Sequence, residues 1–226
     1  MCGRYTHLYT WGEIHDCLNF LNEPVVLRPS YNVAPTQSAP VVRVDASGRR
    51  LDLLKWGLVP SGAKDAKIGY SLINARADTL ASKPSIRQAF KTRRCIVPAS
   101  GFFEWKKVGT GKKHPFYIRS KSDEPFFFAG LWEKSKPQGD EVIESFTIVT
   151  TTPNELVAQL HDRMPVILDR AGIDTWLDPK ASTKNLMAIL KPYPAELMKF
   201  HAVSPAMNTA RYNMPDCVVP VEEPEG

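Results

Sequence analysis

Short apolar runs bounded by turn residues recur along most of this chain, and long helical patterns are few. One helix is predicted near the start, where residues 10–13 form a capping box and apolar residues follow at helical spacing to about Leu21. A second capping box at residues 152–155 has proline at the first helical position. It predicts a short helix that ends at about Leu160.

The apolar runs predict strands joined by tight turns. One hairpin is expected from residues 41–45 and 51–56, and another from residues 102–108 and 115–119. Further strands are expected at 126–132, 145–151, 165–168 and 200–203, and further helices from about Ala171 and Lys184. Strands that follow one another through tight turns pair antiparallel. Since 19 prolines also limit helix length, we expect an α+β fold: a strand-rich, mostly antiparallel, curved or barrel-like sheet with several short helices.

The chain contains no linker that would divide it into domains. We therefore expect a single domain over residues 1–220, a flexible acidic tail over residues 221–226, and a monomer. No apolar stretch approaches the ~18 residues of a membrane helix, and the first residues lack the pattern of a secretory signal. We expect a cytoplasmic protein that does not enter a membrane.

Composition narrows the class of protein further. Of 226 residues, 43% are hydrophobic and 23% charged, which excludes a disordered or fibrous chain. The four cysteines are scattered without a C-x-x-C pair, which argues against a disulfide framework and against a metal site. Lysine and arginine number 29 against 24 acids, a net charge of +5. That excess is compatible with a polyanionic partner but does not establish one.

Cys2 is the most informative residue, because removal of Met1 would leave a cysteine with a free α-amino group. Such an amine has a pKa of about 7.7 to 8.0, so part of it is a neutral nucleophile near pH 7. It could condense with an aldehyde, and the adjacent thiol could then close a five-membered thiazolidine. The alternative is a small buried residue near the start of a strand. Arg4, two residues on, could grip a phosphate.

Two further candidates could transfer protons. His161 lies in a loop between a predicted helix and a predicted strand, where it could be catalytic or could simply pack or cap. Glu104 lies in an aromatic strand, and alternation places it on the opposite face from Trp105. A surface position is the default for a glutamate. A position in a pocket would raise its pKa and suit it to proton transfer.

Three other features are weaker on their own. Asn74 and Arg76 would project together if their segment is extended, although both residue types are also common in turns and on surfaces. Trp105 could stack on a base or belong to the core. The glycine- and lysine-rich residues 109–113 lack the spacing of a phosphate-binding loop and lie between two strands, so we interpret them as a hairpin turn.

Taken in order, five segments of the chain resemble the SOS response-associated peptidase (SRAP) family, whose members process abasic sites in DNA. The segments are residues 1–5, residues 31–35, residues 56–60 with 73–76, residues 101–105 and residues 161–165. Beyond about residue 170 only the general layout is similar. Some members carry an aromatic pair soon after the segment of residues 56–60, where this chain has Ser61-Gly62, so no stacking role is carried over to that point.

The resemblance implies an abasic-site sensor. Cys2 would trap the open-chain aldehyde of an abasic site in single-stranded DNA as a thiazolidine cross-link, with AP-lyase and autopeptidase activities also possible. Asn74 would hold the opened sugar, Glu104 would manage protons at the Cys2 amine, and His161 would assist ring opening or the Schiff-base steps. No metal and no organic cofactor is implied. The implied DNA contacts are three arginines on phosphates and two residues beside the bases: Arg4, Arg76, Arg163, Pro35 and Trp105.

Two other functions stay open at this point. An amidotransferase or hydrolase of the N-terminal nucleophile class would use Cys2 to attack an amide, although its downstream arginine and Asn-Gly segments are not found in this sequence. A noncovalent single-stranded DNA-binding module would need only the basic balance and exposed aromatic residues.

Overall fold

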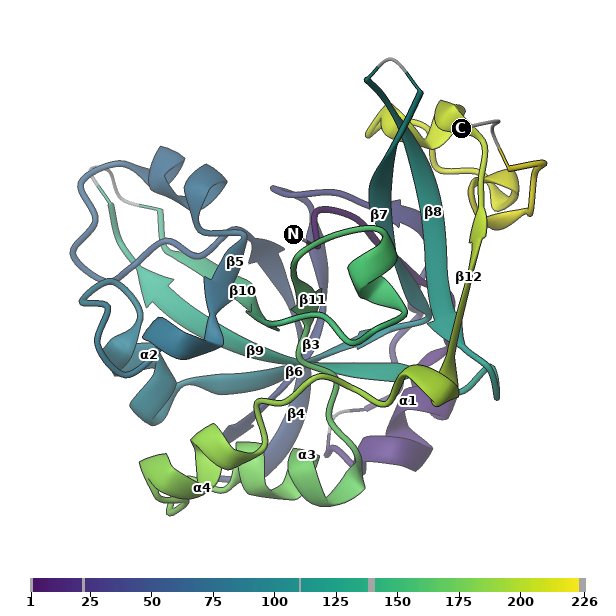
Figure 1. The fold of residues 1–226 in the computed structure, drawn as a ribbon. Coiled ribbons are helices and arrows are strands. Elements are labelled where there is room, and N and C mark those ends of the chain that lie inside the picture. Colours follow the sequence, from purple (N-terminus) through teal and green to yellow (C-terminus); the bar gives the residue numbers. More distant parts are fainter. Residues whose placement is uncertain (1, 22, 110, 138–140, 224–226) are drawn as a thin grey trace.

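The computed structural model describes residues 2–21, 23–109, 111–137 and 141–223, which form two β-sheets packed face to face with helices around them (Figure 1). The first sheet has five antiparallel strands in the order β12-β8-β7-β1-β2. Their bounds are β1 (Tyr5–His7), β2 (Ser30–Val33), β7 (Gly101–Val108), β8 (Lys112–Ser120) and β12 (Met198–Ala202).

The second sheet closes on itself. Its order is β11-β10-β4-β3-β6-β9, and β9 also pairs with β10, so that five strands form a ring. The bounds are β3 (Ser38–Asp45), β4 (Gly48–Trp56), β6 (Arg94–Ala99), β9 (Phe126–Ser135), β10 (Ile143–Thr151) and β11 (Met164–Pro165). Strand β10 pairs in parallel with β4 and with β5 (Asn74–Arg76), and the other pairings are antiparallel. The predicted α+β, barrel-like architecture is confirmed.

The described residues form four short α-helices: α1 (Trp11–Leu18), α2 (Arg87–Thr92), α3 (Arg170–Leu177) and α4 (Thr183–Ala188). The predicted capping box at the start of α1 is present. This helix ends at Leu18 rather than Leu21, because Asn19 takes the left-handed conformation (φ 48°) that terminates helices. None of the helices within the described ranges is long and apolar enough to cross a membrane.

The prediction of a helix that ends at about Leu160 is wrong. Only a 3-10 turn, η3 (Val157–Gln159), forms there. The side chain of Asn154 accepts a hydrogen bond from the Val157 amide (2.9 Å) and donates one to the Tyr193 carbonyl (2.6 Å). These bonds tie the segment to a turn, and a local pattern of capping residues does not outweigh them. The remaining short 3-10 segments are η1 (Ala66–Ser71), η2 (Ala77–Thr79), η4 (Ala195–Leu197), η5 (Pro205–Asn208) and η6 (Pro215–Val218).

The core lies on both faces of the closed sheet. One face carries residues such as Ile96 and Leu131 that pack against the four helices. The other face carries Val97 and Phe128, which pack against the five-stranded sheet. Adjacent residues of β6 and β9 thus belong to different clusters, as expected for strands covered on both sides. Cys2 is a member of the second cluster.

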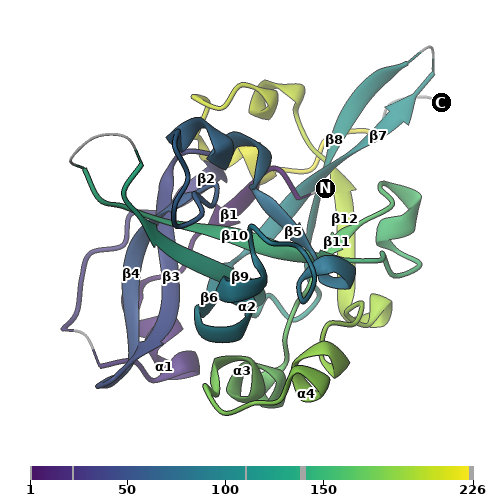
Figure 2. The same ribbon diagram turned by 90° about the vertical axis from the view of Figure 1, so that its left-hand side faces the viewer.

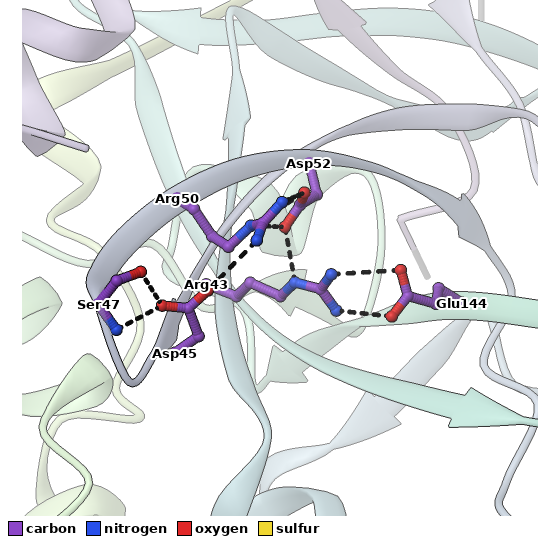
Figure 3. A network of polar contacts seen from close by, with 6 residues as sticks. All are labelled: Arg43, Asp45, Ser47, Arg50, Asp52 and Glu144. Carbon is purple, nitrogen blue, oxygen red and sulfur yellow. Dashed lines mark hydrogen bonds and ion pairs between the residues drawn. The ribbon is translucent and has the colours of Figure 1, made fainter. Parts of the chain in front are cut away.

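A buried arginine joins three strands of the closed sheet (Figure 3). Arg43 on β3 is 9% exposed and donates to Asp52 on β4 (Nε to Oδ2, 2.7 Å). Its two terminal nitrogens bond the two carboxylate oxygens of Glu144 on β10, each at 3.2 Å. The guanidinium also lies 4.2 Å from the ring centre of Trp132. Arg43 therefore connects β3 with two other strands of the ring.

Replacement of this arginine should be costly. Arg43→Met would leave Glu144 without its cation and would remove one of the two cations that pair with the partly buried Asp52, so we expect the free energy of unfolding to fall by about 2 to 3 kcal/mol. Arg50 is a matched control, since it also pairs with Asp52 but its side chain is 43% exposed. Arg50→Met should cost less than about 1 kcal/mol. Urea unfolding of both variants tests this, and equal losses would contradict it.

Candidate functional site

Cys2 lies directly before β1 and has no exposed surface. Its Sγ is 3.9 Å from the carbonyl oxygen of Arg4. Burial raises the pKa of the Cys2 thiol, and the negative charge of Glu104 raises it further. The thiol is therefore neutral at physiological pH, and it lies within electrostatic reach of Glu104.

Asn74 holds the backbone of Cys2. It begins β5, which pairs with β10, and its side-chain amide donates to the Cys2 carbonyl at 2.9 Å. The segment ahead of Asn74 is fixed by Trp56, whose indole donates to the Ile73 carbonyl at 2.9 Å. The other end of the amide, Oδ1, is buried and accepts no hydrogen bond from any described residue. It can therefore accept one from a hydroxyl or an amine that enters the site.

Glu104 faces the interior. It is 1% exposed in the middle of β7, opposite Phe116 of β8. Burial raises the pKa of its carboxyl group to about 7. The default surface position is thus wrong. The side chain is buried because β7 is covered on this face, and a carboxyl group with this pKa can both take up and release a proton near neutral pH.

His161 lies in the loop between η3 and β11 with its Nδ1 facing two possible partners. The Arg163 amide donates to Nδ1 at 3.0 Å, and Asp162 Oδ1 lies 2.8 Å from the same atom. The first contact suits the neutral ring and the second suits the protonated ring. Burial lowers the pKa of His161, which favours the neutral form. The charge of Asp162 also acts on Glu104, so the loop and β7 approach each other.

Two of the predicted arginines share one corner of this site. Arg76 is exposed and pairs with Asp78 (Nη2 to Oδ2, 2.6 Å). Arg163 donates from Nη2 to the Thr150 carbonyl at 2.6 Å, while its buried Nε has no acceptor in the described ranges. Burial lowers the pKa of Arg163, and the positive charge of Arg76 lowers it further. The negative charges of Asp78 and Asp162 act on Arg163 in the opposite direction, so the two arginines lie among two acids.

Arg4, the third predicted arginine, forms hydrogen bonds with β2 and with the C-terminal segment. Its two terminal nitrogens donate to the Asn32 side chain (2.8 Å) and to the carbonyls of Met207 and Asn208 (both 2.9 Å). Asn32 is 1% exposed, and its own amide donates to three carbonyls of the C-terminal segment, those of Met207, Thr209 and Tyr212. We call this set of bonds between Arg4, Asn32 and residues 207–212 the C-terminal clasp. Sequence reasoning did not assign a function to Asn32, since a single asparagine in a short strand carries no distinguishing pattern.

Trp105 and Pro35 lie at the edges of the site. Trp105 is half-buried, on the opposite face of β7 from Glu104 as predicted, and its indole donates to Asn208 Oδ1 at 2.7 Å. Pro35 is half-buried in the turn after β2, next to Thr36, which has a positive φ of 76°. Among the predicted side chains, Asn74 bonds the Cys2 backbone and Glu104 acts electrostatically on its thiol, while the loop of His161 acts on Glu104 through the charge of Asp162.

The donor set does not suit a metal. No group of three or more His, Cys, Asp and Glu side chains that could hold an ion occurs among the residues that the structure describes. What converges is a thiol, an amide, a carboxyl group of raised pKa and two arginines. Such a set can bind an anionic substrate and move protons at a nucleophile.

Comparison with known proteins identifies the family. Residues 1–210 match the model of the family described as SOS response associated peptidase (SRAP). The chain belongs to the SRAP family. The resemblance expected from the five segments is thus confirmed, and it extends beyond residue 170.

Among SRAP relatives, the chain is 44% identical over 223 residues to the protein named abasic site processing protein YoqW from Bacillus subtilis, covering 96% of this chain and 99% of the relative. It is 37% identical to the abasic site processing protein HMCES of Gallus gallus, covering 86% of this chain and 67% of that protein. A crystal structure of a protein from Bacteroides thetaiotaomicron superposes with a TM-score of 0.88 at 26% identity, over 98% of this chain and all of that one.

Proposed function

We propose that this protein is an abasic-site sensor that traps abasic sites in single-stranded DNA through Cys2. The observation that carries the proposal is the contact of Asn74 with the Cys2 carbonyl, with the high-pKa carboxyl group of Glu104 within electrostatic reach. The names of the relatives support the substrate. This chain belongs to the same family as proteins that are named for abasic-site processing, and it carries the five segments that form the site. Abasic-site processing is therefore the simplest function for this chain.

The trapping reaction needs no oxidant and no cofactor. Once Met1 is removed, the neutral α-amine of Cys2 adds to the aldehyde carbon of the opened deoxyribose, and loss of water gives a Schiff base. The thiol then adds to the carbon–nitrogen double bond, its proton passes to the nitrogen, and a thiazolidine ring closes. Glu104 acts electrostatically on the Cys2 thiol and would accept and return the protons that move in these steps, since its pKa is about 7.

The other site residues bind and orient the sugar and the strand. Asn74 Oδ1 would accept a hydrogen bond from a sugar hydroxyl, and His161 would assist ring opening or the Schiff-base steps in its neutral form. Arg76 and Arg163 would grip phosphates, with Pro35 and Trp105 beside the bases.

The predicted contact of Arg4 with a phosphate stays a prediction, and it would have to form beside the bonds that Arg4 already makes. Its nitrogens already donate to the C-terminal clasp.

Further activities follow from the same intermediate. A Schiff base at an abasic site permits β-elimination, so we include weak AP-lyase activity in the proposal. Autopeptidase activity would be the removal of Met1, which a general aminopeptidase could also perform. We propose that the protein acts as a monomer in the cytoplasm, associated with the nucleoid when bound to DNA.

The test is incubation of the purified protein with single-stranded DNA that does or does not contain an abasic site, and separately with glutamine. A covalent product that forms only with the abasic strand is expected. Glutamine hydrolysis would instead favour an amidotransferase, and equal noncovalent binding to both strands without a product would favour a plain binding module. Intact mass of the protein shows whether Met1 has been removed.

The strand preference is a further expectation. An intact duplex keeps the damaged sugar stacked away from a pocket, so cross-linking should be faster in single strands than in duplex. With about three arginines on phosphates, binding of a single strand to the site alone should have a log-log salt slope near −2. Filter binding across a salt series measures this slope, and equal cross-linking in both DNA forms would contradict the proposal.

A further inference from the structure

The hairpin formed by β7 and β8 carries the glycine- and lysine-rich turn that the proposed chemistry does not use. β7 and β8 pair as a hairpin, so this segment connects two strands as predicted and does not open a helix as a phosphate-binding loop would, although Lys112 and Lys113 belong to β8 rather than to the turn. The end of the hairpin projects beyond the two sheets in both views (Figures 1 and 2). We call the described part after Trp105, residues 106–109 and 111–114, the basic arm.

The basic arm and the residues beside it in the sequence carry only positively charged side chains. Residues 105–122 contain six lysines and arginines and no aspartate or glutamate, although the whole chain has 24 acids. Lys106, Lys107 and Lys113 are exposed. Within the described ranges none of these three lysines has an acidic partner in an ion pair. The arm therefore presents unneutralised positive charge to solvent.

The pairing of the two strands makes this arrangement unfavourable for the free protein. Lys107 lies directly opposite Lys113 in the antiparallel register, and like charges at such positions destabilise a hairpin. A bound anion between or beside them would remove that repulsion.

The arm is also connected to the site. It continues the strand that carries Glu104 and Trp105. The charge of Lys113 lowers the pKa of both Glu104 and His161, which places this lysine within electrostatic reach of the two proton-transferring residues. A strand whose damaged sugar lies beside Glu104 therefore has the basic arm next to its neighbouring phosphates.

We propose that the basic arm is a second DNA contact that binds phosphates flanking the abasic nucleotide and takes no part in the chemistry. The inference rests on the proposed function for the position of the DNA. Phosphates fit the arm better than an acidic polypeptide would, because the arm extends directly from the strand that lines the site. The contact should add affinity and salt dependence without any base preference.

The test uses the double variant Lys106→Gln/Lys107→Gln, and Lys113 is left in place because its charge reaches Glu104. The matched control is Lys180→Gln/Lys184→Gln, which removes two exposed lysines at and just before α4, far from the arm in both views. The DNA contains no abasic site, so that noncovalent binding is measured by fluorescence anisotropy across a salt series. For a strand of about 16 nucleotides, the arm variant should lower the magnitude of the log-log salt slope by about 1.4. The control variant should keep the wild-type slope.

Two further measurements sharpen the result. With a strand of about 4 nucleotides, which is short enough to occupy the site alone, the arm variant and the wild type should bind alike. At saturating abasic DNA the rate of adduct formation should be unchanged. The variant should also be no less stable than the wild type, since it removes one member of the Lys107–Lys113 pair.

The two proposals fail separately. A wild-type protein that forms no adduct with abasic DNA would overturn the proposed function, whereas the salt slopes are measured on intact strands. Equal salt slopes for the wild type and the arm variant on the longer strand would overturn the arm proposal and leave the arm as a surface for an acidic polypeptide.

Discussion

Replacement of Cys2 by alanine should abolish the stable covalent product with abasic DNA while leaving noncovalent binding to single-stranded DNA intact. Alanine retains the α-amine, so a Schiff base can still form, but no thiol closes the ring and the adduct hydrolyses. Denaturing gel electrophoresis after incubation measures the product, and the expected yield is below detection. Anisotropy with an intact strand measures the binding that should survive.

Two variants make this result specific. Cys2→Ser should also fail to give a durable adduct, because the oxygen-containing ring hydrolyses more readily. Cys17→Ala is the matched control, since Cys17 lies outside the site and is partly exposed, and it should react as the wild type does. A wild-type yield of stable product from Cys2→Ala would disprove the trapping mechanism.

Glu104→Gln should slow adduct formation, or its reversal, by about 10²-fold, the loss typical when an acid–base group is removed. Glutamine keeps the shape and hydrogen-bonding reach of the side chain but cannot accept the proton. Time courses with a labelled abasic strand, followed by release to a competing strand, measure both directions. Unchanged rates in both directions would remove Glu104 from the chemistry and leave His161 as the candidate for proton transfer.

The same substitution should change the pH dependence of stability. A carboxyl group whose pKa rises from 4.5 to about 7 on folding binds its proton more tightly in the native state, so the protein loses stability as the pH rises between these values. Glu104→Gln removes this loss. At pH 8 the variant should be more stable than the wild type by up to about 3 kcal/mol, at ~1.4 kcal/mol per pKa unit. Near pH 4 the two should be similar, and a variant that is less stable at pH 8 would contradict the assigned burial.

Local patterns predicted the elements whose signals are local. The capping box before α1, the β3–β4 and β7–β8 hairpins and the strand near Phe200 all depend on neighbouring residues, and the structure contains them. Strands β1, β2, β5 and β6 were not predicted. Three of these four strands have at most four residues, too few to show alternation, and β6 is buried along its whole length, so it has no polar face to reveal a period of two.

For the site, too, local patterns predicted some features, while the features that depend on tertiary packing could not be predicted. The residue types at Cys2, Glu104 and His161 indicated the chemistry, and alternation correctly separated Glu104 from Trp105. Alternation could not show which face of β7 is covered, because that depends on how the two sheets pack. The bonds of Arg4 join residues 203 positions apart in the chain, and no pattern in one sequence specifies such a contact.

The C-terminal clasp also orders events in time during synthesis. Arg4 can take its final hydrogen bonds only after Met207 and Asn208 have left the ribosome. At about 5 to 20 residues per second, the 203-residue separation corresponds to roughly 10 to 40 seconds in which the nascent N-terminus is not yet clasped. An aminopeptidase acting on the emerging chain would meet Cys2 in this interval, before the cysteine is buried. Met1 would thus be removed before the C-terminal clasp holds the N-terminal segment. A chain that stalls before residue 207 would carry a reactive aminothiol without the structure that directs it to DNA.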